Sequence, residues 1–348
     1  MSARRLYLDR GPGEDRAVVM LDDKPERLLI ARLDDPPQAR WGERYRARVV
    51  RLDRSLKAAF LDLGEGIEAM LALSGPAVRL VEGGLVAIEI AAEARRGKLA
   101  QARLENPAEP PAPPGRLEAA LSLSDRLQRF APDAPVTLGE EARQVADEAE
   151  AAVLAIEHPL PGGGSLTIEP TRALTAIDVD LGARGGDARR AARQANLTAI
   201  DEAARLLRLK GLGGLLVIDL VGEGHDGPAL TQAARAAFAP DGPGVVLGPV
   251  TRFGTFQLAT PRRSRPLAER LCDETGGRSA ATLALGLLRA LEREGRADGG
   301  ARLTARCAPR VAAAAEPYVA ALTQSLGPRF VLRADPALDL GHFDVSAS

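Results

Sequence analysis

Hydrophobic and polar positions alternate along the first third of the chain, and turn residues divide this pattern into short segments. Residues 5–34 read RLYLDR, DRAVVML and ERLLIARL between Gly, Pro and Asp turns, which predicts two or three strands of a small sheet. From Arg44 onward, closely spaced alternating segments with Gly-containing turns predict a small closed barrel. Residues 106–115, NPAEPPAPPG, hold too many prolines for a helix or a central strand and predict an extended linker.

A helical period replaces the alternation after this linker, over residues 116–156. GGGSLTIEPTRALTAIDVDLG then predicts two strands, and a helix at about residues 187–210 should end at Gly211. GGLLVIDLV follows as a buried strand, so the region predicts a strand–turn–strand–helix–strand α/β core. The tail from about residue 279 predicts two helices and a closing strand, as a third and smaller α/β unit. The apolar stripe of the central helix consists of Ala192, Ala195, Ala199, Ala203 and Leu206.

Composition limits the class of protein without naming its function. At 348 residues the chain is long enough for two or three packed units, and 45% hydrophobic with 27% charged residues indicates a folded, soluble protein. Lys+Arg (46) nearly balance Asp+Glu (47), so any surface for nucleic acid must be local. The two cysteines form no CxxC pair, and the chain has neither an export signal nor a membrane-length apolar run. We therefore expect a cytoplasmic protein with no membrane partner.

Two aspartates stand at matching places, because Asp178 follows the apolar run LTAI and Asp219 follows GGLLVI. A carboxylate buried at the end of an apolar strand needs a cation or hydrogen bonds to offset its desolvation. If the two strands lie side by side, the carboxylates meet and a hard cation such as magnesium relieves their repulsion. The alternative is that each aspartate only caps the turn that follows it.

Two basic segments are candidates for binding phosphates. In LGARGGDARR, a Gly-rich loop precedes a helix with Asp187 as its predicted N-cap. Backbone N–H groups there could hold an anion, with Arg184, Arg189 and Arg190 alongside. The alternative is an ordinary loop that leads into a capped helix. In the barrel, an arginine-rich stretch precedes Phe60, which is typical of single-strand binding by charge and stacking unless Phe60 belongs to the core. That stretch holds Arg44, Arg46, Arg48, Arg51, Arg54 and Lys57.

The three histidines show no ligand-like spacing. His158, His225 and His342 are each expected to be loop or surface residues rather than catalysts. No Ser/His/Asp or Cys/His arrangement is visible either.

The sequence resembles the RNase E/G family along most of its length. LTAIDVD, the Gly-rich loop, QANLTAIDEAARLLRLKGLGGLLVIDLV and VTRFGTFQL are collinear with that family's catalytic region. RARVVRLDRSLKAAFLDLGEGIEAML is similar to its OB-fold RNA-binding domain. The opening strands and the closing segment, from VAAAAEPYVAALTQ to GHFDV, resemble the first and last parts of the family.

This resemblance implies a magnesium-dependent endoribonuclease that cleaves single-stranded RNA and leaves a 5′-phosphate. Asp178 and Asp219 would be the catalytic residues and would hold Mg2+, the implied cofactor. The implied RNA-binding residues are Phe60, Lys98, Arg252 and Phe253, to which Arg184 is added from the loop analysis.

Departures from the family pattern qualify these implications. Asp180 stands where the family has Asn, which adds a carboxylate to the metal site. Met70 replaces a barrel aromatic, and NPAEPPAPPG stands in place of the module that senses an RNA 5′-monophosphate. Cys272 in LCDETGG is what is left of a zinc-linking cysteine pair, so no zinc site is expected. A homodimer is one possible assembly of the chain.

The expected fold is α/β, or α+β multidomain. Alternative functions are a relative that binds RNA without cutting it, favoured by Asp180 and Met70, and a magnesium phosphohydrolase for small molecules, disfavoured by the barrel. The predicted parts are an RNase H-like subdomain (residues 1–38 and 116–160) interrupted by an OB-fold β-barrel (39–105), the Pro-rich linker (106–115), a catalytic α/β subdomain (161–270), a degenerate zinc-link region (271–278) and a small C-terminal α/β domain (279–348).

Overall fold

The computed structural model describes residues 4–36, 38–73, 80–182 and 187–348. The chain divides into two compact units, each built from separate stretches of sequence. No helix within the described ranges is long and apolar enough to cross a membrane. The domain boundaries predicted above are finer than this division and stay predictions. Unit 1 comprises Met1–Pro36, Leu121–Glu148 and Leu267–Ser348, and unit 2 comprises Pro37–Ala120 and Ala149–Pro266.

Unit 1 begins with an antiparallel meander of three strands, which confirms the strands expected in residues 5–34. A short fourth strand lies parallel to the first. Leu6 and Leu8 pack with Leu127 of a short helix into a small core, because alternate side chains of a strand share one face. The elements are β1 (Arg4–Gly11), β2 (Glu14–Leu21), β3 (Lys24–Arg32), α1 (Leu123–Gln128) and β10 (Val136–Thr137), followed by α2 (Glu140–Leu154).

The C-terminal stretch of unit 1 forms the small α/β part expected from the sequence. Its sheet has the order β18-β17-β19, with β17 parallel to β18 and antiparallel to β19. Leu287, Leu291 and Tyr318 belong to the buried core between this sheet and its helices. The elements are α5 (Ala268–Leu271), α6 (Ala280–Ala297), β17 (Leu303–Cys307), α7 (Pro309–Ala315), α8 (Val319–Leu326), β18 (Phe330–Ala334) and β19 (Phe343–Ala347).

Buried ion pairs join the three stretches of unit 1. Arg16 is fully buried, and its guanidinium lies 2.6 Å from Asp9 and 2.8 Å from Asp147. Arg143 contacts Glu292 at 2.9 Å. Burial alone would raise the pKa of the Glu14 carboxyl, but the charges of Arg289 and Arg32 outweigh it and hold that pKa below its usual value. These paired charges fix how the separate stretches pack, because an unpaired charge in this interior would be costly.

We predict that Arg16→Met lowers the free energy of unfolding by about 3 kcal/mol, because it leaves the buried Asp9 without its closest cation. Urea unfolding measures this loss. Arg5→Met is the matched control, since Arg5 pairs with the exposed Asp23 and its removal should cost less than about 1 kcal/mol. Equal losses in the two variants would contradict the importance assigned to the buried pair.

The first part of unit 2 is a closed, five-stranded, OB-like barrel, as the alternating pattern predicted. Neighbouring strands follow the order β4-β5-β6-β8-β7, and β7 pairs with β4 to close the ring. Among the described barrel strands, β6 and β8 pair in parallel and the other neighbours are antiparallel. A further strand, β9 (Gly115–Arg116), follows the Pro-rich segment and pairs with β4. The barrel strands are β4 (Arg44–Asp53), β5 (Ala58–Asp62), β6 (Glu68–Ala72), β7 (Leu85–Ala92) and β8 (Ala100–Asn106).

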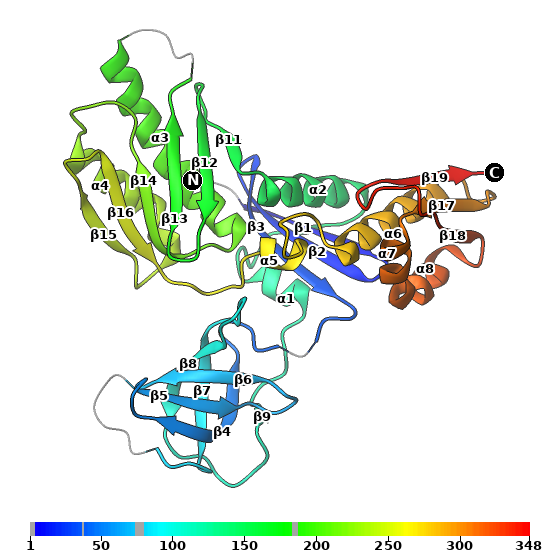
Figure 1. The fold of residues 1–348 in the computed structure, drawn as a ribbon, viewed down its shortest axis with the longest axis horizontal. Helices are drawn as coiled ribbons and strands as arrows, with labels where there is room; N and C mark the ends of the chain where they lie inside the picture. Colours follow the sequence, from blue (N-terminus) through cyan, green and yellow to red (C-terminus); the bar gives the residue numbers. More distant parts are fainter. Residues whose placement is uncertain (1–3, 37, 74–79, 183–186) are drawn as a thin grey trace. The chain divides into compact units, whose positions relative to one another are not determined.

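The second part of unit 2 is a six-stranded mixed sheet with the order β11-β12-β13-β14-β16-β15. β13 and β14 are parallel and are joined through α3, whereas the other neighbouring pairs are antiparallel. Figure 1 shows α3 running alongside these strands. The elements are β11 (Glu157–Pro159), β12 (Ser165–Pro170), β13 (Thr175–Asp180), α3 (Ala188–Lys210), β14 (Gly214–Asp219), α4 (Gly227–Ala237), β15 (Val246–Val250) and β16 (Thr255–Thr260).

Helix α3 confirms the expected helix almost to the residue. The Asp187 side chain accepts a hydrogen bond from the N–H of Arg190, which is the N-cap predicted from the sequence. Gly211 ends the helix with φ +68°, a left-handed conformation that glycine adopts without strain. All members of the predicted apolar stripe are buried.

His158 corrects the expectation that every histidine is a loop or surface residue. It lies in β11 opposite Leu166 and is only 7% exposed, because it falls on the buried face of the sheet. Burial lowers the pKa of His158 to about 4, and the charges of Lys210 and Arg205 act in the same direction. The folded protein therefore holds this imidazole neutral.

We predict that His158 makes the protein less stable in mild acid. Its pKa is lower in the folded state (about 4) than in the unfolded state (about 6.5), so the unfolded chain binds the extra proton and stability falls as the pH drops through this interval. Denaturant unfolding at these two pH values measures the effect. On lowering the pH, the free energy of unfolding of the parent should fall by on the order of 2 kcal/mol more than that of His158→Gln. The matched control is His342→Gln, at an exposed histidine, and it should follow the parent.

Candidate functional site

The two predicted aspartates lie side by side on the exposed face of the mixed sheet. Along β13 the buried Ile177 and Val179 alternate with the exposed Asp178, and along β14 the buried Ile218 precedes the exposed Asp219. The parallel register pairs Asp178 directly with Asp219. Since neighbouring strands are about 4.8 Å apart, the two carboxylates are held close together on one face.

Hydroxyl side chains extend this pair into a row across four strands. Thr167 of β12 lies opposite Asp178, and Thr255 of β16 lies opposite Asp219. The Thr255 hydroxyl also lies 2.7 Å from that of Thr251. Sequence reasoning did not find either threonine, because their place beside the aspartates depends on strand register. Alternation within each strand was the one signal that could have indicated their face.

The aspartates are exposed, which differs from the buried setting assumed for them in the sequence argument. The apolar side chains of β13 and β14 lie on the buried face of the sheet, and both aspartates lie on the other, exposed face. Repulsion between adjacent carboxylates, rather than desolvation, is therefore the physical reason for a cation here. Two carboxylates beside hydroxyl oxygens form a hard donor set with open access for water and phosphate, which suits magnesium.

Asp180 lies on the same face as Asp178 but one row nearer the end of β13, opposite Ser165. One of its carboxylate oxygens accepts the N–H of Gly182 at 2.6 Å, so it also holds the turn that leaves the strand. In the described part of the chain, no three His, Cys, Asp or Glu side chains gather as a set of metal ligands. The geometry thus joins Asp178 with Asp219 and leaves Asp180 at their side.

A buried asparagine fixes the chain just beyond Asp219. Asn196 of α3 donates from Nδ2 to the carbonyl oxygen of Val221 at 2.9 Å, and its Oδ1 accepts the N–H of Val221 at 3.0 Å. Asn196 is 2% exposed, so both bonds are shielded from water. The helix therefore sets the direction in which the chain leaves β14. Asn196 is not among the residues predicted from the sequence.

Arg252 and Phe253 lie in the tight turn between β15 and β16. The N–H of Gly254 donates to Thr251, and the N–H of Leu220 donates to Gly254, which attaches the turn to the residue after Asp219. Phe253 is 76% exposed, and the Arg252 guanidinium lies 4.8 Å from its ring centre. An exposed aromatic ring thus stands next to the carboxylate row.

The barrel candidates take two different positions. Phe60 is half-buried outside the buried core cluster, with the Arg51 guanidinium 4.1 Å above its ring and Met70 opposite it on β6. Lys98 is exposed in the turn between β7 and β8. Part of the basic stretch is neutralised, since Arg44 pairs with both Glu105 and Glu118. The barrel face is therefore less cationic than the sequence alone indicates.

The remaining expectations concern the Gly-rich loop and the cysteine. Arg184 lies outside the described residues. The backbones of Cys272 and Arg278 form an antiparallel bridge across a short hairpin, and the N–H of Ser279 donates to the carbonyl oxygen of Leu271 beside it.

Comparison with known proteins gives a match to the central part of the chain. Residues 123–263 match the sequence model of the Ribonuclease E/G family. Ribonuclease E of Haemophilus influenzae is 39% identical over 146 residues, which are 39% of this chain and 16% of that protein. Ribonuclease E of Escherichia coli is 38% identical over 146 residues, 39% of this chain and 14% of that protein.

A plant protein shows a similar partial match. The chloroplastic Ribonuclease E/G-like protein of Arabidopsis thaliana is 31% identical over 129 residues, 35% of this chain and 13% of that protein. The chain therefore spans roughly a sixth or less of the length of these curated relatives. Both aspartates, Asn196 and the Arg252–Phe253 turn fall inside the residues that the family model matches, whereas the barrel precedes them. The similarity of this chain to the Ribonuclease E/G family therefore covers residues 123–263, the part that carries the two aspartates.

Proposed function

We propose that the chain is a magnesium-dependent endoribonuclease that cleaves single-stranded RNA. The observation that carries this proposal is the side-by-side placement of Asp178 and Asp219 on an open sheet face, within the residues matched to a ribonuclease family. The names of the relatives support RNA as the substrate, since each is a ribonuclease.

The residues of the sheet would hold the cation and the scissile phosphate. Asp178 and Asp219 present oxygens from adjacent strands, and Thr167 and Thr255 flank them with hydroxyl groups. A bound magnesium ion would supply charge stabilisation at the phosphate and a more acidic water. Asp180 would add negative charge one row away while its oxygen keeps the turn closed.

The reaction is a hydrolysis of one phosphodiester bond. A water oxygen attacks phosphorus, the bond to the 3′ oxygen of the upstream nucleotide breaks, and that oxygen takes a proton. The downstream product then keeps a 5′-phosphate. Because an open face admits an extended strand, the substrate would be single-stranded, with Phe253 stacking on one of its bases.

The proposal extends to the fold around the site. The meander β1–β3 with β10 parallel to β1 is compatible with the RNase H-like subdomain expected from the resemblance, and the barrel is compatible with an RNA-binding OB domain. Phe60 and Lys98 would contact RNA from that barrel.

We predict that Asp178→Asn combined with Asp219→Asn lowers the rate of RNA cleavage by at least about 100-fold, because the pair can no longer hold a divalent cation. The assay uses labelled single-stranded RNA with magnesium or with EDTA. The matched control is Asp23→Asn, which makes the same change at an exposed carboxylate of unit 1 and should cleave normally. Cleavage by the double variant at the parental rate would refute the site. Binding by the parent without any metal-dependent cleavage would instead favour an RNA-binding relative that does not cut.

We predict that Phe253→Ala weakens RNA binding by about 1–3 kcal/mol, the range for loss of one stacked base. Folding should be unaffected because the ring is exposed. Affinity is measured by fluorescence anisotropy in the non-cleaving double variant. Val246→Ala, at an exposed apolar side chain on β15, is the matched control and should bind normally. Phe60→Ala should lose at least about 1 kcal/mol if its ring also stacks, and no change would make Phe60 a packing residue.

A further inference from the structure

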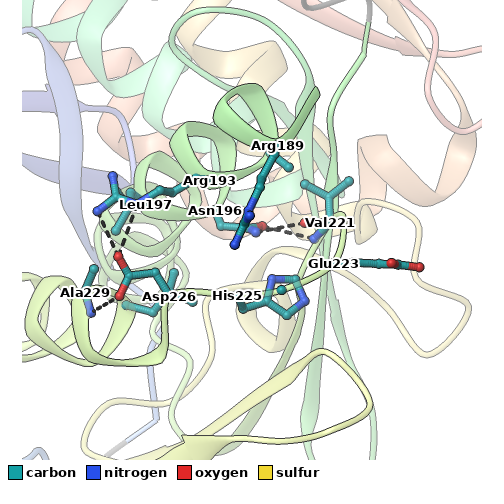
Figure 2. Close-up of a pocket in the computed structure, with 12 residues that line it drawn as sticks. Arg189, Arg193, Asn196, Leu197, Val221, Glu223, His225, Asp226 and Ala229 are labelled. Atoms are coloured by element: carbon teal, nitrogen blue, oxygen red, sulfur yellow. Dashed lines mark hydrogen bonds and ion pairs between the residues drawn. The ribbon is translucent and has the colours of Figure 1, made fainter. Parts of the chain in front are cut away.

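The loop between β14 and α4 separates two hollows in unit 2. On one side lies a cavity of about 380 Å³ against the first turns of α3, which we call the Arg189 cavity (Figure 2). On the other side, a hollow of about 700 Å³ reaches Arg252 in the β15–β16 turn. Residues Glu223, Gly224 and His225 line both hollows, so the loop forms their shared wall.

The Arg189 cavity combines an apolar floor with flat polar groups at its rim. Ala192 of α3 and Leu230 of α4 line it and are buried. Figure 2 shows the Arg189 side chain reaching toward the ring of His225, while Glu223 points away from both. The guanidinium and the imidazole thus offer planar surfaces above hydrocarbon.

Within the described residues, one of the two arginines that line the cavity is paired with a carboxylate and one is not. Arg193 is paired with Asp226 at 3.1 Å, and Asp226 also accepts the N–H of Ala229 as the cap of α4. Arg189, by contrast, makes no hydrogen bond or ion pair with any residue that the structure describes. An unpaired guanidinium over an apolar floor suits a nucleobase better than a bare phosphate, because a base needs both stacking and removal from water.

The cavity has a fixed position relative to the carboxylate row. Asn196 and Val221 are both among its lining residues, and their paired hydrogen bonds hold the chain two residues beyond Asp219. Two residues of extended chain span at most about 7 Å, so the cavity lies within a few nucleotides of a phosphate at the aspartates. Its volume falls in the lower part of the roughly 300–1,000 Å³ range of ligand pockets, which suits one nucleotide rather than a duplex.

We propose that the Arg189 cavity takes one unstacked nucleobase of the RNA strand beside the cut, held between the Arg189 guanidinium and the His225 ring. This inference rests on the proposed function for the identity of the strand. It assigns to the loop after Asp219 a role in positioning the substrate and in choosing its bases.

The test measures RNA binding in the Asp178→Asn/Asp219→Asn background, so that cleavage does not interfere. The probes are single-stranded RNA oligonucleotides in which one nucleotide at a time is abasic. At one position, loss of the base should weaken binding on the order of tenfold. Adding Arg189→Ala and His225→Ala should weaken binding of the intact RNA by a similar factor and abolish the penalty at that position alone.

Arg190→Ala is the matched control, because Arg190 is an exposed arginine beside Arg189 that does not line the cavity. It removes the same charge and should keep the abasic penalty unchanged. The inference is overturned if the penalty survives in the Arg189/His225 variant, or if no abasic position is sensitive. It is also overturned if Arg190→Ala has the same effect.

A parallel cleavage assay of the parent with magnesium separates the two proposals. If the RNA is cut but no abasic penalty depends on Arg189 and His225, the nucleobase subsite is refuted and the nuclease proposal stands. If the RNA is bound but never cut, and one abasic penalty does depend on these two residues, the nuclease proposal is refuted and the subsite stands.

Discussion

The parallel pairing of β13 with β14 is the constraint on which the candidate site depends. It sets Asp178 beside Asp219, and a shift of one residue would turn one aspartate onto the buried face. Helix α3 makes this pairing feasible, because parallel neighbours need a long crossover connection. The same helix carries Asn196, which fixes the chain beyond Asp219. One crossover unit therefore positions the carboxylates and the loop that follows them.

The two faces of this sheet divide its tasks. The apolar residues of β13 and β14 pack against the helical side and supply the stability of the layer, since burial of apolar surface is the main favourable contribution to folding. The other face is free to hold like charges close together, where water and a cation can reach them. The half-buried Thr167 and Thr255 complete a row of oxygen-bearing side chains beside them. Exposure is thus what makes the pair suitable for binding a metal and a phosphate.

Unit 1 uses charge in the opposite way. Arginines and carboxylates such as Arg16 and Asp9 are buried there as pairs, so their charges are neutralised inside the protein and hold distant stretches of sequence together. The carboxylates of Asp178 and Asp219 face each other's negative charge instead of an arginine. That difference separates acidic groups that serve the fold from those that can serve chemistry.

Local patterns along the chain were enough to predict the secondary-structure elements and to identify the candidate carboxylates. Hydrophobic period, the Asp187 cap and Gly211 defined α3, and alternation with Gly turns indicated the barrel, because these signals act over a few residues. Strand register and burial, by contrast, are properties of the folded chain. In the fold the aspartates are exposed, His158 is buried, and Thr167, Asn196 and the Arg189 cavity lie at the site. These features could not be predicted, since contacts between distant residues leave no local pattern in the chain.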